Sequence, residues 1–135
     1  MSETAMPRDT ALKIVADVEK AFGDRDIDII LAGFTDDVVV RFADQPELRG
    51  KENLRKLLEA RFARQKGYRL QKRLRMLEGN MVGNYWDGEW EDAFTGKIMV
   101  GRGTEFWTFQ DGKVSIWEAA FNVWERDAPT RPPCA

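Results

Sequence analysis

The sequence predicts an α+β fold in which three N-terminal helices cover a cone-shaped, strongly curved antiparallel sheet. Apolar residues recur with helical spacing in the first half of the chain, whereas the second half alternates with a period of two. Short glycine-containing turns interrupt that alternation and predict hairpins. Long strands curve and leave an aromatic face that must be covered, so we expect the helices to cover it.

The composition suits one compact domain, which we place at residues 9–126, with flexible tails at 1–8 and 127–135. Of the 135 residues, 43% are hydrophobic and 33% are charged, and the formal net charge is -2. A charge this small gives no overall field that would attract nucleic acid or an anionic membrane, so we expect neither as a partner. The sequence has no apolar run of membrane-spanning length and no signal-peptide pattern, which favours a cytoplasmic protein.

The chain contains no histidine, and its single cysteine, Cys134, lies in a proline-rich tail. Without histidine, acid–base chemistry falls to Asp, Glu, Tyr or Lys, and the commonest metal ligand is missing. We therefore expect no metal and no cofactor. An incidental thiol is a simpler interpretation of Cys134 than a nucleophile.

The first helix is expected over residues 10–22, with Asp9 or Thr10 as its N-cap and Gly23 as its stop. Its apolar residues are Leu12, Ile14, Val15, Val18 and Phe22. Asp26 then caps a short second helix. The residues expected on its buried face are Ile27, Ile30, Leu31 and Phe34.

A brief β-branched strand over residues 38–42 and a loop over 43–50 precede the third helix, at 51–64. Gly67 is expected to end this helix. Four strands follow, at residues 68–77, 81–92, 97–110 and 113–126.

The first of these strands alternates, with apolar side chains on one face and basic ones on the other. The apolar face consists of Tyr68, Leu70, Leu74 and Met76. A nucleic-acid stripe is the alternative interpretation of the basic face, but no aromatic residues interleave with it for base stacking. Solvated basic side chains on an edge strand explain the pattern more simply.

The order of helix, helix, strand, helix and four strands resembles the nuclear transport factor 2-like superfamily, in particular its SnoaL-like (polyketide-cyclase-like and ketosteroid-isomerase-like) members. The motifs that carry the resemblance are Arg25-Asp26-Ile27-Asp28, Leu48-Arg49-Gly50-Lys51-Glu52 and Phe106-Trp107-Thr108-Phe109. The patterns at 88–92 and 103–107 are similar to an uncharacterised bacterial subfamily. The resemblance implies the cone-shaped fold and a small-molecule pocket inside it.

The catalytic positions of the superfamily fall on five residues of this chain. In the resemblance, the isomerase's carboxylate base falls on Phe42, its oxyanion-hole tyrosine on Val18 and the neighbouring carboxylic acid on Glu105. The His and Asp of the cyclases fall on Trp117 and Ala119. Glu105 is therefore the one candidate catalytic residue that the resemblance implies.

An inward-pointing Glu105 would lie in an aromatic pocket, because side chains two apart on a strand share a face. The candidate ligand-binding residues are Phe22, Phe34, Val40, Phe42, Trp86, Trp90, Gly103, Trp107, Trp117, Ala119 and Phe121. No inward lysine is evident, so we expect burial to keep the Glu105 carboxyl protonated or to require a hydrogen-bonding partner for it. The alternative is that the aromatic side chains fill the core and Glu105 bonds a neighbour.

Two classes of function follow. The first is a pocket protein for a small apolar or aromatic molecule, which it converts as an isomerase, hydratase or cyclase with Glu105 as acid or base. The second is a non-catalytic dimeric domain that binds a ligand or a protein. Phe106, Ile116 and Ala120 lie among charges on the opposite, convex face of the sheet, which predicts a homodimer through that face.

Overall fold

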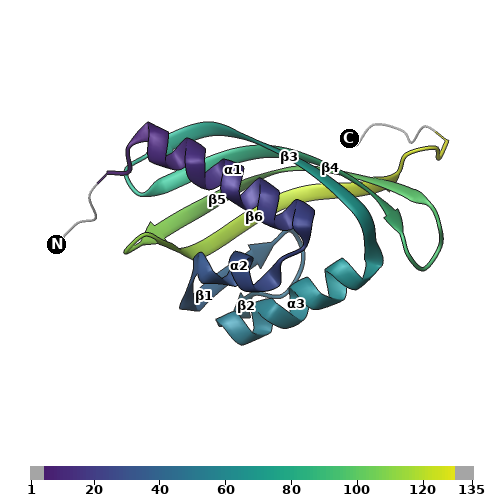
Figure 1. Cartoon of the computed structure of the whole chain (residues 1–135), viewed down its shortest axis with the longest axis horizontal. Helices are drawn as coiled ribbons and strands as arrows, with labels where there is room; N and C mark the ends of the chain where they lie inside the picture. Colours follow the sequence, from purple (N-terminus) through teal and green to yellow (C-terminus); the bar gives the residue numbers. More distant parts are fainter. Residues whose placement is uncertain (1–4, 130–135) are drawn as a thin grey trace.

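The computed structural model describes residues 5–129, which form three helices and six strands (Figure 1). The elements are α1 (Arg8–Asp24), α2 (Ile27–Ala32), β1 (Phe34–Phe42), β2 (Leu48–Arg49), α3 (Lys51–Arg64), β3 (Gln65–Glu78), β4 (Met81–Asp92), β5 (Ile98–Gln110) and β6 (Lys113–Glu125). The predicted α+β class is confirmed. Residues 1–4 and 130–135, which include Cys134, lie outside the described part of the chain.

The six strands form one open sheet in the order β2-β1-β6-β5-β4-β3. Neighbouring strands are antiparallel except β1 and β6, which run parallel. In Figure 1 the long strands β3 to β6 curve, and α1 lies across one face of them while α3 lies beside the shorter strands. The helices therefore cover the inner face of the sheet, as predicted for the cone-shaped fold.

The ends of α1 differ from the prediction. No side chain caps its first turn, so the expected roles of Asp9 and Thr10 are wrong. The helix passes through Gly23 and ends at Asp24; Arg25 caps it, and the left-handed backbone of this residue (φ 56°) directs its N–H to carbonyls of the last turn. Leu12 is 43% exposed, because the contact face of α1 runs along Ala11, Val15 and Phe22.

Asp26 caps α2 as predicted, and its side chain accepts a hydrogen bond of 3.1 Å from the backbone N–H of Ile29. Phe34 begins β1 instead of ending α2, because this residue pairs with Val114 of β6. Gly67 lies inside β3, where its φ of 64° accompanies a register shift. The helix therefore continues into the strand without the glycine stop that we expected.

A second register shift in β3, between Leu74 and Met76, reverses the inward order of the side chains. Met76 is 59% exposed, so its predicted place on the inner face is wrong. Leu77, which pairs with Val82, packs against the core instead. A β-bulge of this kind has no reliable sequence signal.

In β5 the predicted faces are confirmed: from Gly101 to Phe109, buried residues alternate with exposed ones or, at Thr108, a half-buried one. In β6 a register shift opposite Thr108 and Phe109 precedes Trp117, which then lies directly opposite Trp107. Within residues 5–129, no helix is long and apolar enough to cross a membrane.

Candidate functional site

Glu105 lies in the middle of β5 and is 1% exposed. Its Oε2 accepts hydrogen bonds from Lys72 Nζ at 2.6 Å and from Asn84 Nδ2 at 3.1 Å. Its Oε1 accepts one from Trp117 Nε1 at 2.9 Å. Side chains from β3, β4 and β6 therefore hold this carboxyl, which fits the expectation that a hydrogen-bonding partner would be required.

Lys72 is the counter-ion of Glu105, and its side chain is 4% exposed. The expectation that no lysine points inward is therefore wrong. The cation lies 5.6 Å from the ring centroids of Trp86 and Trp107, and 5.7 Å from that of Phe22. Aromatic faces attract a desolvated cation, so this surrounding and the ion pair together offset the unfavourable burial of Lys72.

Asn84 lies opposite Glu105 on β4 and is also buried. Its Nδ2 bonds Glu105, while its Oδ1 has no hydrogen-bond partner among the described residues. Neither Lys72 nor Asn84 was predicted from the sequence. Position 72 does alternate in phase with Leu70 and Leu74, and that phase was the available signal.

The space beside Glu105 is small. The cavity that this carboxylate shares with Arg61, Tyr68 and Lys72 has a volume of about 30 Å³. This volume admits one water molecule with several polar partners, but it excludes an aromatic molecule. The structure therefore places Glu105 in a nearly filled part of the core.

A larger pocket opens between α3, the inner face of the sheet and the β4–β5 turn, with a volume of about 600 Å³. Its lining includes Leu57, Arg61, Tyr68, Trp86, Trp90, Met99 and Phe121. Four of its residues also line the small cavity: Arg61, Tyr68, Trp86 and Phe121. We call these four residues the partition, because they separate the open pocket from Glu105.

The two polar members of the partition are electrostatically perturbed. The Arg61 guanidinium lies 5.3 Å from the centroid of the Phe42 ring and 5.8 Å from that of Phe121, and burial lowers the pKa of Arg61. Burial also raises the pKa of Tyr68 to about 12; the positive charge of Arg61 opposes this shift and the nearby Glu105 adds to it. Tyr68 therefore remains a neutral hydroxyl near pH 7.

The rim of the open pocket carries two ion pairs. Arg64 Nε donates to Asp92 Oδ1 at 2.6 Å, and Thr95 Oγ1 donates to Asp92 Oδ2 at 2.7 Å. These two hydrogen bonds, that of Arg64 first, hold the pKa of Asp92 below its usual range. Lys97 Nζ lies 3.5 Å from Glu125 Oε2. Both acidic residues therefore have cationic partners of their own.

A third hollow, of about 320 Å³, lies between α1, α2 and the sheet, beyond Phe22 and Trp117. Aromatic side chains thus divide the interior, and three separate spaces replace the single aromatic pocket expected from the sequence. The predicted ligand-binding residues in the open pocket are Trp86, Trp90 and Phe121. Those around the small cavity are Phe22, Phe42, Trp86, Trp117, Ala119 and Phe121. Those around the third hollow are Phe22, Phe34, Trp107 and Trp117.

Val40 and Gly103 line none of these three spaces. Val40 is 1% exposed and belongs to the core. At Gly103 an added Cβ would lie 2.5 Å from the Cβ of Phe121, so the glycine permits close approach of β6. Within residues 5–129, no cluster of side chains is suited to hold a metal ion.

The fold matches solved structures over most of their length. An M. tuberculosis LEH-like epoxide hydrolase aligns with a TM-score of 0.70 and 19% identity, covering 84% of each chain. The epoxide hydrolase/cyclase-like enzyme SalBIII aligns with a TM-score of 0.76 and 13% identity, covering 87% of this chain and 96% of SalBIII. A nuclear transport factor 2-like protein of unknown function from Burkholderia pseudomallei aligns with a TM-score of 0.74 and 17% identity, covering 84% of this chain and 91% of that one. These similarities establish the nuclear transport factor 2-like fold.

At the level of sequence, the family described as "Protein of unknown function (DUF1348)" matches residues 5–129. The match spans all helices and strands of the structure. No curated protein matches the chain significantly.

Proposed function

We propose that this chain, which belongs to the DUF1348 family, binds a small apolar or aromatic molecule in the open pocket. The observation that carries the proposal is the pocket itself, whose volume of about 600 Å³ is typical of small-molecule sites. Trp86, Trp90 and Phe121 give it an aromatic lining. The similar folds of an epoxide hydrolase and of SalBIII support small-molecule chemistry by analogy only.

Native mass spectrometry of the purified protein, followed by calorimetric titration of the molecule it retains, tests this proposal. Trp90→Ala should weaken binding, because this indole lines the open pocket. Trp124→Ala is the matched control, because Trp124 lies outside the pocket lining. Equal losses in both variants would count against the open pocket as the binding site.

A second candidate function is cofactor-independent acid–base catalysis by Glu105, as an isomerase, hydratase or cyclase. The specific observation in its favour is that the partition borders both the open pocket and the cavity beside Glu105. One water molecule in that cavity would connect the carboxylate with a molecule in the pocket. The Lys72 cation would stabilise the ionised form of Glu105 in such a proton transfer. Against catalysis stand the three hydrogen bonds that already engage Glu105, so binding without catalysis remains the first proposal.

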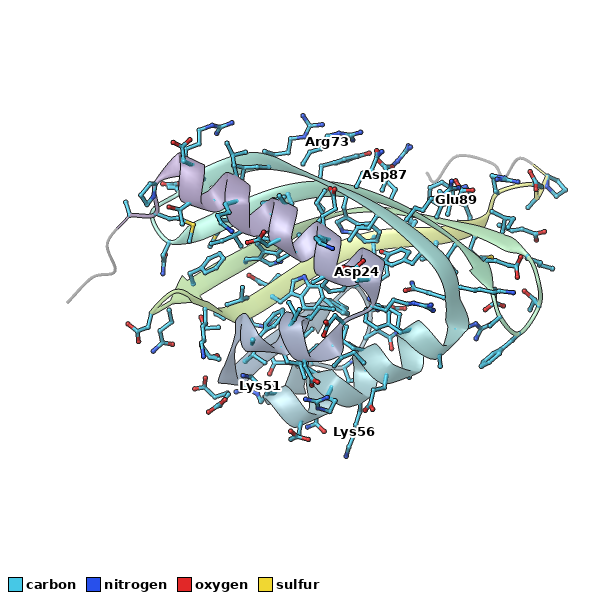
Figure 2. All side chains as sticks on the ribbon, in the orientation of Figure 1. Asp24, Lys51, Lys56, Arg73, Asp87 and Glu89 are labelled. Carbon is cyan, nitrogen blue, oxygen red and sulfur yellow. The ribbon has the colours of Figure 1, made fainter. Side chains whose placement is uncertain are left out.

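We further propose that two copies pair through the outer face of the sheet, the face turned away from the helices. Phe106 is 42% exposed there, and its ring packs over Gly83. Charges of this face already pair within the chain, as Arg102 with Asp87 at 2.8 Å and Arg126 with Glu89 at 2.8 Å; Figure 2 labels the two acidic residues, which lie on β4. Such a surface can be buried without leaving an isolated charge.

A further inference from the structure

We infer that the molecule bound in the open pocket is an organic anion, with an aromatic or apolar body and a carboxylate that Arg61 and Tyr68 bind. The inference rests on the proposed small-molecule function and adds to it the chemical class of the ligand. Helix α3 places Arg61 at the boundary between the open pocket and the small cavity.

Arg61 differs from the other charged residues around the open pocket. Arg64 pairs with Asp92, and Lys97 pairs with Glu125. No ion pair or hydrogen bond links the Arg61 guanidinium to another residue within 5–129; it lies over the rings of Phe42 and Phe121. The pocket therefore contains one cation whose charge the described residues do not balance.

Glu105 does not supply the missing counter-ion. Its two oxygens accept from Lys72, Asn84 and Trp117, and the Lys72 cation lies within 2.6 Å. A partly buried cation without an anion is unfavourable, which is why burial lowers the pKa of Arg61. An incoming carboxylate would remove this penalty.

The geometry around Arg61 suits such a ligand. The two rings that Arg61 approaches carry no oxygen or nitrogen acceptor, so its N–H groups remain available, and their fork matches the two oxygens of a carboxylate. Tyr68 lines the same boundary, and its raised pKa of about 12 keeps the hydroxyl a donor over the physiological range. Both groups donate hydrogen bonds, as an anion requires.

Gln65 adds a second polar position to the pocket lining. The residue is 7% exposed, and its Oε1 has no hydrogen-bond partner among the described residues. A buried acceptor of this kind favours a ligand that also carries a hydroxyl or amine donor. The pocket thus combines an apolar body site with donors for an anion and one acceptor.

Calorimetric titration with 2-naphthoate and with the uncharged 2-naphthamide tests the inference. Wild-type protein should bind 2-naphthoate about tenfold more tightly or better, the factor expected for a hydrogen bond to a charged group. Arg61→Met should reduce the affinity for 2-naphthoate to that for the amide and leave the amide unchanged. Arg75→Met is the control, because the Arg75 guanidinium also lies over an aromatic ring, 5.5 Å from the centroid of Tyr85, but outside the pocket.

The outcomes separate the two proposals. Equal binding of both probes by wild-type protein would overturn the anion inference and leave small-molecule binding in place. Binding of neither probe would overturn both. If Arg61→Met does not fold, two other measurements test the inference: titration of Arg61→Lys, and the side-chain NMR signal of Arg61 Nε–H in the wild-type protein. In the wild type, 2-naphthoate should shift that signal and 2-naphthamide should not. An Arg61 signal that ignores 2-naphthoate would refute the inference.

Discussion

The buried pair of Lys72 and Glu105 makes this site sensitive to single substitutions. Glu105→Gln removes the negative charge and leaves the Lys72 cation in a protein interior where both side chains are almost fully covered. We expect the free energy of unfolding to fall by about 3–5 kcal/mol, the range observed when one partner of a buried ion pair is removed. Urea denaturation at pH 7 measures this change.

The double variant Lys72→Met/Glu105→Gln is the decisive comparison, because it buries no charge. It should be more stable than Glu105→Gln alone. Asp17→Asn is the control: it breaks the exposed pair with Lys13 and should change stability by less than about 1 kcal/mol. A Glu105→Gln variant as stable as this control would contradict the buried ion pair.

Tyr68 provides a pH-dependent prediction. Its pKa of about 12 in the folded chain exceeds the value of about 10 for an unfolded tyrosine. Between these values the unfolded chain loses the proton while the folded chain retains it. The contribution of Tyr68 to stability is therefore complete below pH 10 and declines as the pH rises toward 12.

Spectrophotometric titration of phenolate absorbance measures this shift directly. A component that titrates near pH 12 should be present in the wild type and absent from Tyr68→Phe. Loss of a component near pH 10 in the variant would instead show that Tyr68 is exposed to solvent.

Single residues also mark the limit of sequence-based prediction. The inward orientation of Glu105 follows from strand alternation and holds in the structure. The same alternation placed position 72 on the inner face, but a lysine charge is usually interpreted as exposed, and its partner lies on another strand. A buried ion pair is a property of two distant positions, so neither one alone predicts it.

At the scale of elements, local signals predicted the hairpins well. Strand β4 begins and ends where expected, and the turn at Asp111 and Gly112 joins β5 to β6. The bulges in β3 and the parallel pairing of β1 with β6 depend on contacts far apart in the chain. Those contacts have no signature in a short stretch of sequence, and this is why Met76 and Phe34 were assigned incorrectly.

The stability of the turn between β4 and β5 should depend on pH through Asp92. The hydrogen bonds of Arg64 and Thr95 lower the pKa of Asp92, so its carboxylate stabilises the folded chain above the unfolded pKa of about 4. That contribution is lost as the pH falls through the lowered folded value. Asp92→Asn should therefore lower the melting temperature at pH 7 and have a smaller effect at pH 3.

Calorimetric melting curves of both proteins at the two pH values check this expectation. Glu47→Gln is a matched control in the loop between β1 and β2, because hydrogen bonds from Arg41 and Arg49 also lower the pKa of Glu47 at a more exposed position. A destabilisation by Asp92→Asn that is equal at pH 7 and pH 3 would show that its charge contributes nothing to the turn.

At the scale of the whole molecule, the division of the interior determines what the fold can hold. Phe22 and Trp117 meet edge to face at 6.0 Å, and both border the small cavity and the third hollow. The open pocket lies at the other end, beyond the partition. A curved sheet with helices on one side thus leaves an open space of about 600 Å³ where α3 runs into β3.

The outer face of the sheet carries the last prediction, that the chain is a homodimer. Phe106, at 42% exposure, and Met81, at 40%, place apolar area among charges that are already paired within the chain. A stable two-fold interface should bury well over about 1,000 Å² in total, and Phe106 would lie inside it. Phe106→Glu would then bury an unpaired carboxylate and separate the subunits.

Light scattering at micromolar concentration should give a dimer mass for the wild type and a monomer mass for this variant. Ile29→Glu, at a residue of α2 that is 62% exposed, should remain dimeric, because the helices lie on the opposite face of the sheet. A monomeric wild type, or a dimeric Phe106→Glu, would refute pairing through this face.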